Sequence, residues 1–240
     1  MKLDWSILWG DAGLLILQGL VVTLQLSAWV LALAFVLGLA FGTLRWIGLR
    51  VMEPICWFYV EFARNTPPVV QLLFWYFSAS YILPGWLFLQ LRDFGYEFGA
   101  AVVALAIYHG AFIAEVVRAG LNSVPKGQFE GARALGLGPL QSLRRIVMPQ
   151  ALRITIPPLV NESVAIIKNT SLAMAIGVTE LTYQYKHIDN FAFRGTEALA
   201  AITVLYVAIC LALSALTTRL GHQLSRHVAA PAARPLATGE

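Results

Sequence analysis

The chain alternates long apolar runs with short polar connections. Crossing the hydrocarbon core of a membrane takes about 20 apolar residues in a helix, and five runs satisfy this: residues 12–44, 51–83, 98–121, 151–176 and 197–220. The first run is longer than one crossing requires, so we expect its start to lie along the outer interface. The pattern predicts an all-α membrane protein with five transmembrane helices.

The second run contains a break at residues 64–68, Arg-Asn-Thr-Pro-Pro. Thr66 is expected to cap a helix that begins at Pro67, because proline at a first helical position lacks only an N–H that would be unpaired there. Residues 84–93 read as a polar connection. The connection that ends at Gly195 is expected to hold a short amphipathic helix, with one face formed by Leu181, Tyr185 and Ile188.

The ends of the chain differ in character. Residues 1–221 are predicted to form one transmembrane domain. Residues 222–240 contain prolines among alanines and are expected to be a disordered cytoplasmic tail.

Basic residues gather on one side of this arrangement. Loops on the cytoplasmic side of membrane proteins carry an excess of lysine and arginine. One side has Arg45, Arg50, Arg118, Lys126, Arg133, Arg144, Arg145, Arg153, Arg219, Arg226 and Arg234, and the other has only Lys2, Arg92, Lys186 and Arg194. The bias predicts an N-terminus outside the cell membrane, and residues 122–150 and the C-terminus inside.

Composition agrees with a membrane protein. Hydrophobic residues are 58% of the chain and charged residues 12%, against about 25% charged residues in soluble domains. The net charge of +4 does not indicate a nucleic-acid partner, because the basic residues lie between apolar segments. Cys56 and Cys210 both fall inside apolar runs, so neither a disulfide nor a metal site is expected.

The polar loop at residues 122–150 has the features of two short helices joined by a glycine elbow. Gly136 and Gly138 permit the left-handed backbone that closes a helix, and Pro139 suits the start of a second helix. Pro149 is expected to end that second helix. Such a compact knob fits a groove on a partner and transmits force without stretching.

The spacing within this loop is specific. Glu130-Gly131-Ala132 is followed by Gly136, and then by Ile146-x-x-Pro149. This resembles the cytoplasmic coupling loop of bacterial ABC-importer permeases, in which Glu-Ala-Ala, three residues, Gly, nine residues and Ile-x-Leu-Pro follow one another. Gly131 replaces the first alanine, and Met148 replaces the leucine. The resemblance implies that the loop docks on a separate ATPase through Glu130, Gly131, Ala132, Gly136, Leu140 and Pro149.

Further stretches resemble one branch of these permeases, the polar-amino-acid uptake systems. They are residues 64–72, 110–120, and 157–161 continued by 168–172 and 177–181. Asn65 stands where that family usually has glycine or serine. The resemblance implies a type I ABC-importer transmembrane domain in a bacterial inner membrane. It also implies four kinds of partner: an identical or related second permease, a dimer of ATPase subunits that bind ATP and magnesium, a periplasmic substrate-binding protein and an amino-acid substrate.

The fourth predicted helix carries ionisable residues at membrane depth, where they usually face an interior or a water-filled cavity. At about 100° per residue, Asn161, Glu162, Lys168 and Asn169 share one face. Glu162 is placed to meet the ammonium of an amino acid and Lys168 a carboxylate, while Thr170 and the two asparagines offer neutral hydrogen bonds. The alternative is that these groups bond within the dimer interface and never touch substrate, with Glu162 or Lys168 in an interhelical ion pair.

Other polar residues are interpreted as structural. Glu115 and Arg118 are three residues apart on a helix and are expected to pair. Glu61 and Arg64 flank the helix break near the inner surface. His109 is expected to make a packed polar contact within the bundle.

Two other classes of function fit the sequence less well. An ion channel or secondary transporter would need no ATPase, but five spans are too few for the inverted repeats of transporters, and the loop would then serve no purpose. An intramembrane enzyme is disfavoured because no catalytic motif or phosphate-binding loop is present. The sequence leaves the substrate open, although Lys168 favours acidic or amide amino acids such as glutamate, aspartate or glutamine.

Overall fold

The computed structural model describes residues 4–93 and 95–226, and the elements found in these residues are all helical. They are η1 (Trp5–Trp9), α1 (Asp11–Ile47), α2 (Glu53–Asn65), α3 (Pro68–Ile82), α4 (Gly85–Asp93), α5 (Tyr96–Asn122), α6 (Lys126–Ala134), α7 (Pro139–Ser142), the π-helical turn η2 (Leu143–Val147), α8 (Met148–Asn169), η3 (Thr170–Ile176), α9 (Leu181–Ala192) and α10 (Gly195–Arg226).

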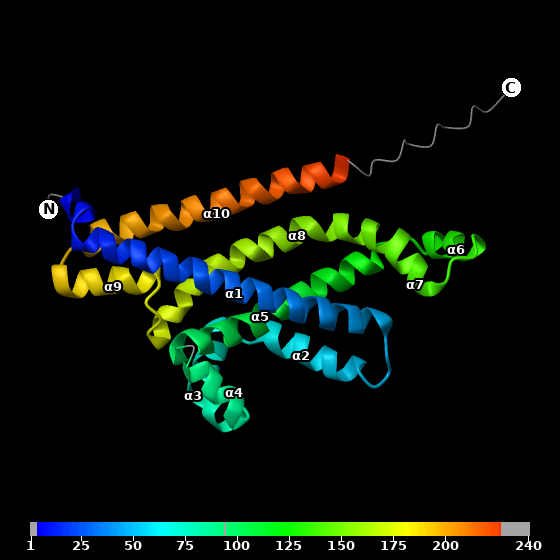
Figure 1. The fold of residues 1–240 in the computed structure, drawn as a ribbon, viewed down its shortest axis with the longest axis horizontal. Helices are drawn as coiled ribbons and strands as arrows, with labels where there is room; N and C mark the ends of the chain where they lie inside the picture. The colour runs from blue at the N-terminus through cyan, green and yellow to red at the C-terminus, as the bar shows by residue number, and fades with distance from the viewer. Residues whose placement is uncertain (1–3, 94, 227–240) are drawn as a thin grey trace.

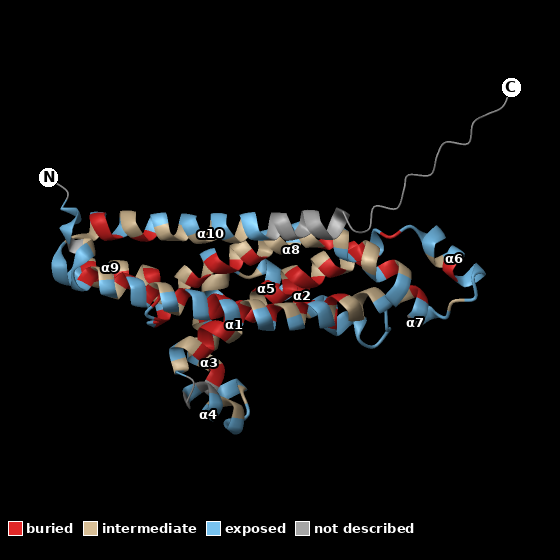
Figure 2. Cartoon of the chain, turned by 45° about the horizontal axis from the view of Figure 1, so that its top comes forward, coloured by how far each residue is buried: buried red, intermediate tan, exposed pale blue. Residues whose placement is uncertain are grey.

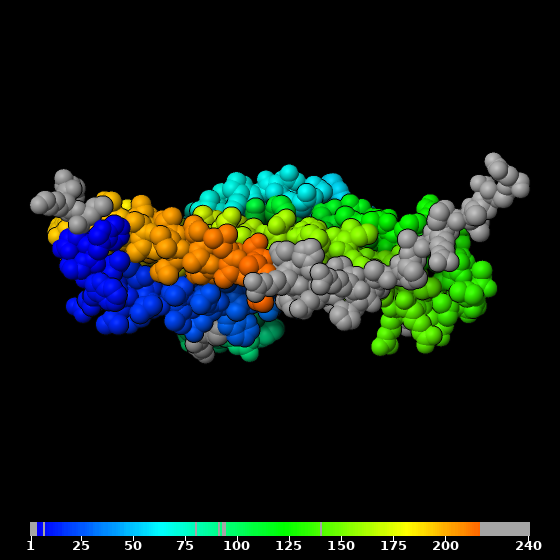
Figure 3. Space-filling view, turned by 90° about the horizontal axis from the view of Figure 1, so that it is seen from above, coloured from blue at the N-terminus to red at the C-terminus, as the bar shows by residue number. Residues whose placement is uncertain are grey.

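The long helices α1, α5, α8 and α10 form an elongated bundle (Figure 1). η1 and α9 lie at one end, whereas α6 and α7 lie at the other, toward which α10 runs. α3 and α4 project from the side of the bundle (Figures 1 and 2). On another face, α10 lies beside α1 and α8 (Figure 3). The molecule therefore has two distinct ends joined by continuous helices.

The most extensive seam in the bundle joins α1 to α5. A Cβ atom added at Gly38 would lie 2.3 Å from Ile113 Cγ2, and one added at Gly42 would lie 2.6 Å from the carbonyl oxygen of Ala114. Gly38-x-x-x-Gly42 is the spacing that lets two backbones approach within a membrane, where packing replaces the hydrophobic effect as the force between helices. The backbone contact explains why α1 buries small residues here although its sequence is apolar on every side.

The structure bears out the helical class, but it does not establish five spans. Within the described residues, α1, α5 and Gly195–Leu216 of α10 are long and apolar enough to cross a membrane. Leu143–Ile176 and Leu181–Ala192 meet at a 45° bend, and they give a fourth span if the two are taken as one. The predicted run at residues 51–83 is divided into α2 and α3, with 13 and 15 residues, so neither alone has the length of a crossing.

The break between α2 and α3 differs in detail from the prediction. Pro67 is extended and caps α3, which begins at Pro68. The hydroxyl of Thr66 donates to the carbonyl of Phe62, so it closes α2 and does not cap α3. Helix ends leave carbonyls without partners, and the Gln71 amide satisfies another by donating to Ala63 at 2.7 Å.

Other boundaries also required correction. Residues 85–93, read as a polar connection, form α4. Pro149 does not end a helix, because α7 continues through the wide turn η2 into α8 without a gap. Proline is tolerated there because it lies in the first turn of α8, next to a π-helical turn whose hydrogen bonding is already altered.

The short amphipathic helix is confirmed as α9, which buries Leu181 and Ile188 against α1 and α10. Most of the expected tail, residues 227–240, lies outside the described residues.

Enlarging Gly38 should break the seam between α1 and α5. Gly38→Leu forces the backbones apart, and overpacking of this kind typically costs about 1–3 kcal/mol. We expect a lower midpoint of thermal unfolding for the detergent-solubilised protein. The matched control is Gly85→Leu, because a Cβ at Gly85 meets nothing within 4 Å. Equal midpoints for the two variants would contradict the close packing.

Candidate functional site

The two short helices form an exposed knob at one end of the bundle (Figure 2). Gly136 has φ +75°, the left-handed conformation expected of the elbow. Glu130, Gly131 and Gly136 are exposed, whereas Ala132 is buried beneath them. Leu135, a large apolar side chain, is 79% exposed. The side chain of Leu140 lies outside the described part of the chain. The knob thus has an acid, an open backbone and an apolar side chain on its surface.

An aromatic contact ties the knob to α1. The rings of Trp46, near the end of α1, and Phe129, in α6, stack with centroids 6.3 Å apart and planes at 29°. Both side chains pack against the main core of the bundle. A displacement of α6 is therefore felt directly by α1.

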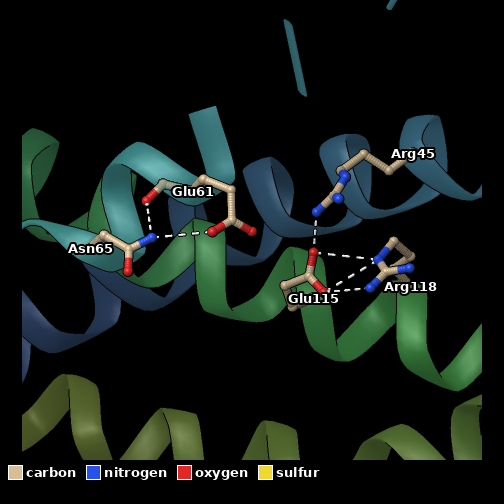
Figure 4. Close-up of polar contacts among 5 residues, drawn as sticks. All are labelled: Arg45, Glu61, Asn65, Glu115 and Arg118. Carbon is tan, nitrogen blue, oxygen red and sulfur yellow. Dashed lines mark hydrogen bonds and ion pairs between the residues drawn. The ribbon is translucent and has the colours of Figure 1, made fainter. Parts of the chain in front are cut away.

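An ion-pair cluster joins the same end of α1 to α5 (Figure 4). Glu115 accepts from Arg45 of α1 and also from Arg118, whose Nη2 lies 2.8 Å from Glu115 Oε2. The predicted pairing of Glu115 with Arg118 is confirmed, but Arg45 was missed. Nothing in the sequence places Arg45 beside a residue 70 positions away.

The break between α2 and α3 holds its own polar contacts. Asn65, the residue that departs from the family pattern, donates to the side chain of Glu61 at 3.1 Å (Figure 4). The Arg64 guanidinium lies 5.5 Å from the centroid of the Phe112 ring in α5, which is within the range of a cation–π contact. These contacts fit the structural role expected of Glu61 and Arg64.

The polar residues of α8 face two different neighbours. Glu162 and Asn169 contact α5, whereas Lys168 borders a groove toward α10. His109 of α5 is 1% exposed and bonds Glu162 through Nδ1, while Asn169 Nδ2 lies 3.2 Å from His109 Nε2. An imidazole protonated on Nδ1 donates to the carboxylate and accepts from the amide, so one neutral tautomer satisfies both contacts. The packed polar contact expected of His109 is present, and its partner is Glu162.

Within this chain Glu162 pairs with His109 of α5 and not with Lys168. The Lys168 ammonium is exposed and has no ion-pair or hydrogen-bond partner among the described residues. It borders a groove of about 480 Å³ between the end of α8 and α10, whose lining includes Ser171, Thr182 and Tyr206. Because the two residues are six positions apart in an α-helix, Lys168 points about 120° away from Glu162 around the axis of α8.

The remaining residues of the predicted face also separate. Asn161 is exposed, but Thr170 is buried and donates to the carbonyl of Ile167 at 2.6 Å. Thr170 is therefore occupied by the helix end, which leaves Asn161, Lys168 and the half-buried Glu162 as the side chains open to a ligand.

Glu180 is a polar residue whose role sequence reasoning missed. Its carboxylate is fully buried. It accepts from the backbone N–H groups of Thr182 and Tyr183, each at 2.9 Å, and from the hydroxyl of Tyr206 at 2.7 Å. Glu180 therefore caps the N-terminus of α9 and also links α9 to α10. A glutamate directly before an amphipathic helix was the available signal.

Among the described residues, no group of three or more histidine, cysteine or acidic side chains is arranged to hold a metal ion.

The comparisons with known proteins place the chain in a family. Residues 34–226 match the model described as "Binding-protein-dependent transport system inner membrane component". The chain belongs to this family. This membership covers the knob and every helix from the middle of α1 onward.

Relatives of this permease are named for amino-acid transport. It is 39% identical to the Glutamine transport system permease protein GlnP of Escherichia coli (strain K12), over 93% of this chain and 99% of the relative. It is 32% identical to the Glutamate/aspartate import permease protein GltJ of the same strain, over 80% of each chain. The resemblance to amino-acid ABC permeases is confirmed.

A solved structure agrees with the fold. The permease superposes on a chain of "an amino acid ABC transporter with histidines" with a TM-score of 0.79 and 30% identity, covering 93% of this chain and all of the other. The fold is therefore that of an ABC-importer transmembrane subunit, and the reading as a permease is favoured over a channel or secondary transporter without an ATPase.

Double-mutant cycles should detect the His109–Glu162 contact. Residues in direct contact show coupling energies of about 0.5–3 kcal/mol, whereas uncoupled sites add within about 0.5 kcal/mol. We expect coupling between His109→Ala and Glu162→Ala in the free energy of unfolding in mixed micelles. The cycle of Glu162→Ala with Lys168→Ala should be additive. Coupling in the second cycle alone would assign the ion pair to Lys168.

Proposed function

We propose that this permease forms the membrane path of an ATP-driven importer of polar amino acids, with glutamine, glutamate or aspartate as the substrate. The observation that carries this proposal is the 39% identity to a permease named for glutamine transport over nearly the full length of both chains. An identical or related second permease completes the path. A periplasmic binding protein supplies the substrate, and ATP and magnesium bind to the partner ATPase.

The proposed topology has five crossings, and the direction of the helices supports it. The Arg45–Glu115 contact and the Trp46–Phe129 stack place the C-terminal ends of α1 and α5 together near the knob. The chain must therefore return from that end between α1 and α5. α2 and α3 carry the chain back, so we count the two helices together as one broken crossing, which brings the total to five. The arginine-rich knob then lies in the cytoplasm and α9 in the periplasm.

Coupling follows from the rigidity of this end. We infer that the ATPase binds the knob through Glu130, Gly136 and the exposed Leu135. Closure of the ATPase dimer draws the knob inward, and the Trp46–Phe129 stack and the Glu115 cluster pass the displacement to α1 and α5 as a unit. Bundles with two packing arrangements respond to such a push by switching between inward-open and outward-open states.

The side chains open to substrate lie on α8. Lys168 is a cation without a partner in the described chain, and it suits an α-carboxylate or an acidic side chain. Glu162 uses Oε1 for His109, and its other oxygen is free among the described residues to accept from an ammonium. Asn161 supplies a neutral amide.

Reconstitution tests the function directly. The permease, its ATPase and its binding protein, placed together in proteoliposomes, should accumulate labelled glutamine, glutamate or aspartate only when ATP is present. Omitting either partner should abolish uptake. ATP-independent flux through the permease alone would contradict the proposal and favour a channel or secondary transporter.

The glycine elbow provides a test of docking. A left-handed backbone costs a side-chain-bearing residue about 1–2 kcal/mol, so Gly136→Val should lower the population of the docking-competent elbow by roughly 5- to 30-fold. Uptake per ATP hydrolysed should fall while membrane insertion is unchanged. The control is Gly138→Val, because Gly138 lacks a positive φ and a Cβ there meets nothing within 4 Å. Normal coupling in Gly136→Val would refute the docking assignment.

Topology is tested by cysteine labelling. In a variant that lacks Cys56 and Cys210, single cysteines at Gln141 and Gln223 should resist an impermeant thiol reagent in intact cells. A cysteine at Asn190, exposed on α9, should react. Labelling at Gln141 from outside would invert the proposed orientation.

A further inference from the structure

The groove beside Lys168 receives side chains from four elements, α8, η3, α9 and α10. It lies where the end of α8 runs beside α10 (Figure 3), and its volume is about 480 Å³. Ile202, Val207 and Leu211 supply apolar walls. Sites for small ligands usually measure about 300–1,000 Å³ and combine an apolar lining with a few polar groups. The groove therefore has the size and the composition of a small-ligand site.

Two hydroxyl groups that line the groove donate to the preceding turn of their own helical segments. Ser171 Oγ lies 2.7 Å from the carbonyl oxygen of Lys168, and Thr203 Oγ1 lies 2.7 Å from the carbonyl oxygen of Leu199. A hydroxyl group has one proton to donate and two lone pairs that accept. Because each proton is used within the helix, these two oxygens can only accept from a ligand.

Tyr206 and Thr182 use their protons within the protein as well. The Tyr206 hydroxyl donates to the buried carboxylate of Glu180 at 2.7 Å, and its oxygen lies 3.3 Å from Thr182 Oγ1. Since the Tyr206 proton is bonded to Glu180, Thr182 is the donor in the second contact. The Thr182 oxygen therefore also faces the groove as an acceptor.

Donors in the groove are correspondingly few. Among the described side chains that line it, Lys168 supplies the one ammonium, and the Cys210 thiol is only a weak donor. The Lys168 ammonium has no ion-pair or hydrogen-bond partner within the same part of the chain. A ligand that fits must therefore bring an anionic group for the ammonium and N–H groups for the surrounding oxygens.

Glutamine and glutamate differ at the group that would meet these oxygens. Both have an α-carboxylate, which suits Lys168. The side-chain carboxamide of glutamine ends in an NH2 group that donates two hydrogen bonds, whereas the side-chain carboxylate of glutamate only accepts. The second carboxylate of glutamate would face oxygens that cannot donate to it. A site discriminates strongly when the wrong ligand leaves polar groups without partners.

We propose that this groove selects amide amino acids over acidic ones. Lys168 binds the α-carboxylate of glutamine, and the oxygens of Ser171, Thr182 and Thr203 accept from its carboxamide and ammonium, so that these three are specificity-determining residues. Glu162, which points toward α5, takes no part in this selection. The inference rests on the proposed function, because that function supplies an amino acid as the ligand, and it narrows the three substrates named there.

Equilibrium binding to the full-length permease, assembled with its ATPase in lipid nanodiscs, tests the selection. The binding protein is left out so that its own preference does not enter. Labelled glutamine should bind at least about tenfold more tightly than labelled glutamate. Lys168→Met should weaken the binding of both by roughly ten- to a hundredfold, because both lose the same charge-assisted contact. Lys168→Arg keeps the charge and should retain most of the binding.

Thr203→Val distinguishes selection from simple attraction to Lys168. The change removes an acceptor oxygen and alters the shape little, so glutamine should bind about two- to tenfold more weakly, while the binding of glutamate should not weaken. Thr203→Ser should keep the wild-type ratio of the two affinities. The matched control is Thr196→Val, because Thr196 is exposed on the same helix and is not part of the groove lining.

The outcomes separate the groove from the function as a whole. Equal affinities for glutamine and glutamate, or an equal loss of both in Thr203→Val, would overturn the selection. The groove is also overturned as an amino-acid site if the wild type binds neither ligand, or if it retains a phospholipid beside Lys168 that glutamine does not displace. None of these results bears on import by the complete transporter. Failure of that transporter to take up any of the three amino acids with ATP would instead count against the proposed function.

Discussion

The backbone contact between α1 and α5 is the constraint on which the rest of the structure depends. Gly38 and Gly42 let the two helices approach until a single Cβ atom would not fit. In a membrane, close packing of this kind replaces the hydrophobic effect as the force that holds helices together. The Glu115 cluster then fixes the two helices at the knob end, so α1 and α5 behave as one rigid body against which the other helices are arranged.

Charged and polar groups in this bundle are placed mainly at the joints between helices. Glu115 joins α1 to α5, His109 joins α5 to α8, and Glu180 joins α9 to α10. Each contact satisfies a group that would be costly to leave unpaired in an apolar setting. Lys168 differs, because it has no partner in the described chain. That contrast separates a residue available to a ligand from residues that hold helices together.

The sequence predicted the long helices and the knob because apolar length and glycine–proline spacing are local signals. It also predicted α9 from its amphipathic pattern. It did not predict Arg45 as the partner of Glu115, nor His109 as the partner of Glu162, since these contacts join residues 70 and 53 positions apart. The error at Pro149 had another cause. Pro149 lies in the first turn of α8, where its missing N–H costs little, and η2 had already altered the hydrogen bonding there.

The seamless passage from α7 through η2 into α8 has a mechanical consequence. The second helix of the knob, the turn η2 and α8, which carries Glu162 and Lys168, form one continuous helical segment, residues 139–169, which at 1.5 Å per residue is roughly 45 Å long. A tilt of about 5° at the knob displaces the far end of such a lever by roughly 4 Å. Pro157 and Pro158, which lie inside α8, weaken its hydrogen bonding part-way along and make that region its natural point of flexure. A rotation at the knob end therefore moves the first half of α8 directly, and the bend at Pro157 and Pro158 sets how much of that movement reaches Lys168.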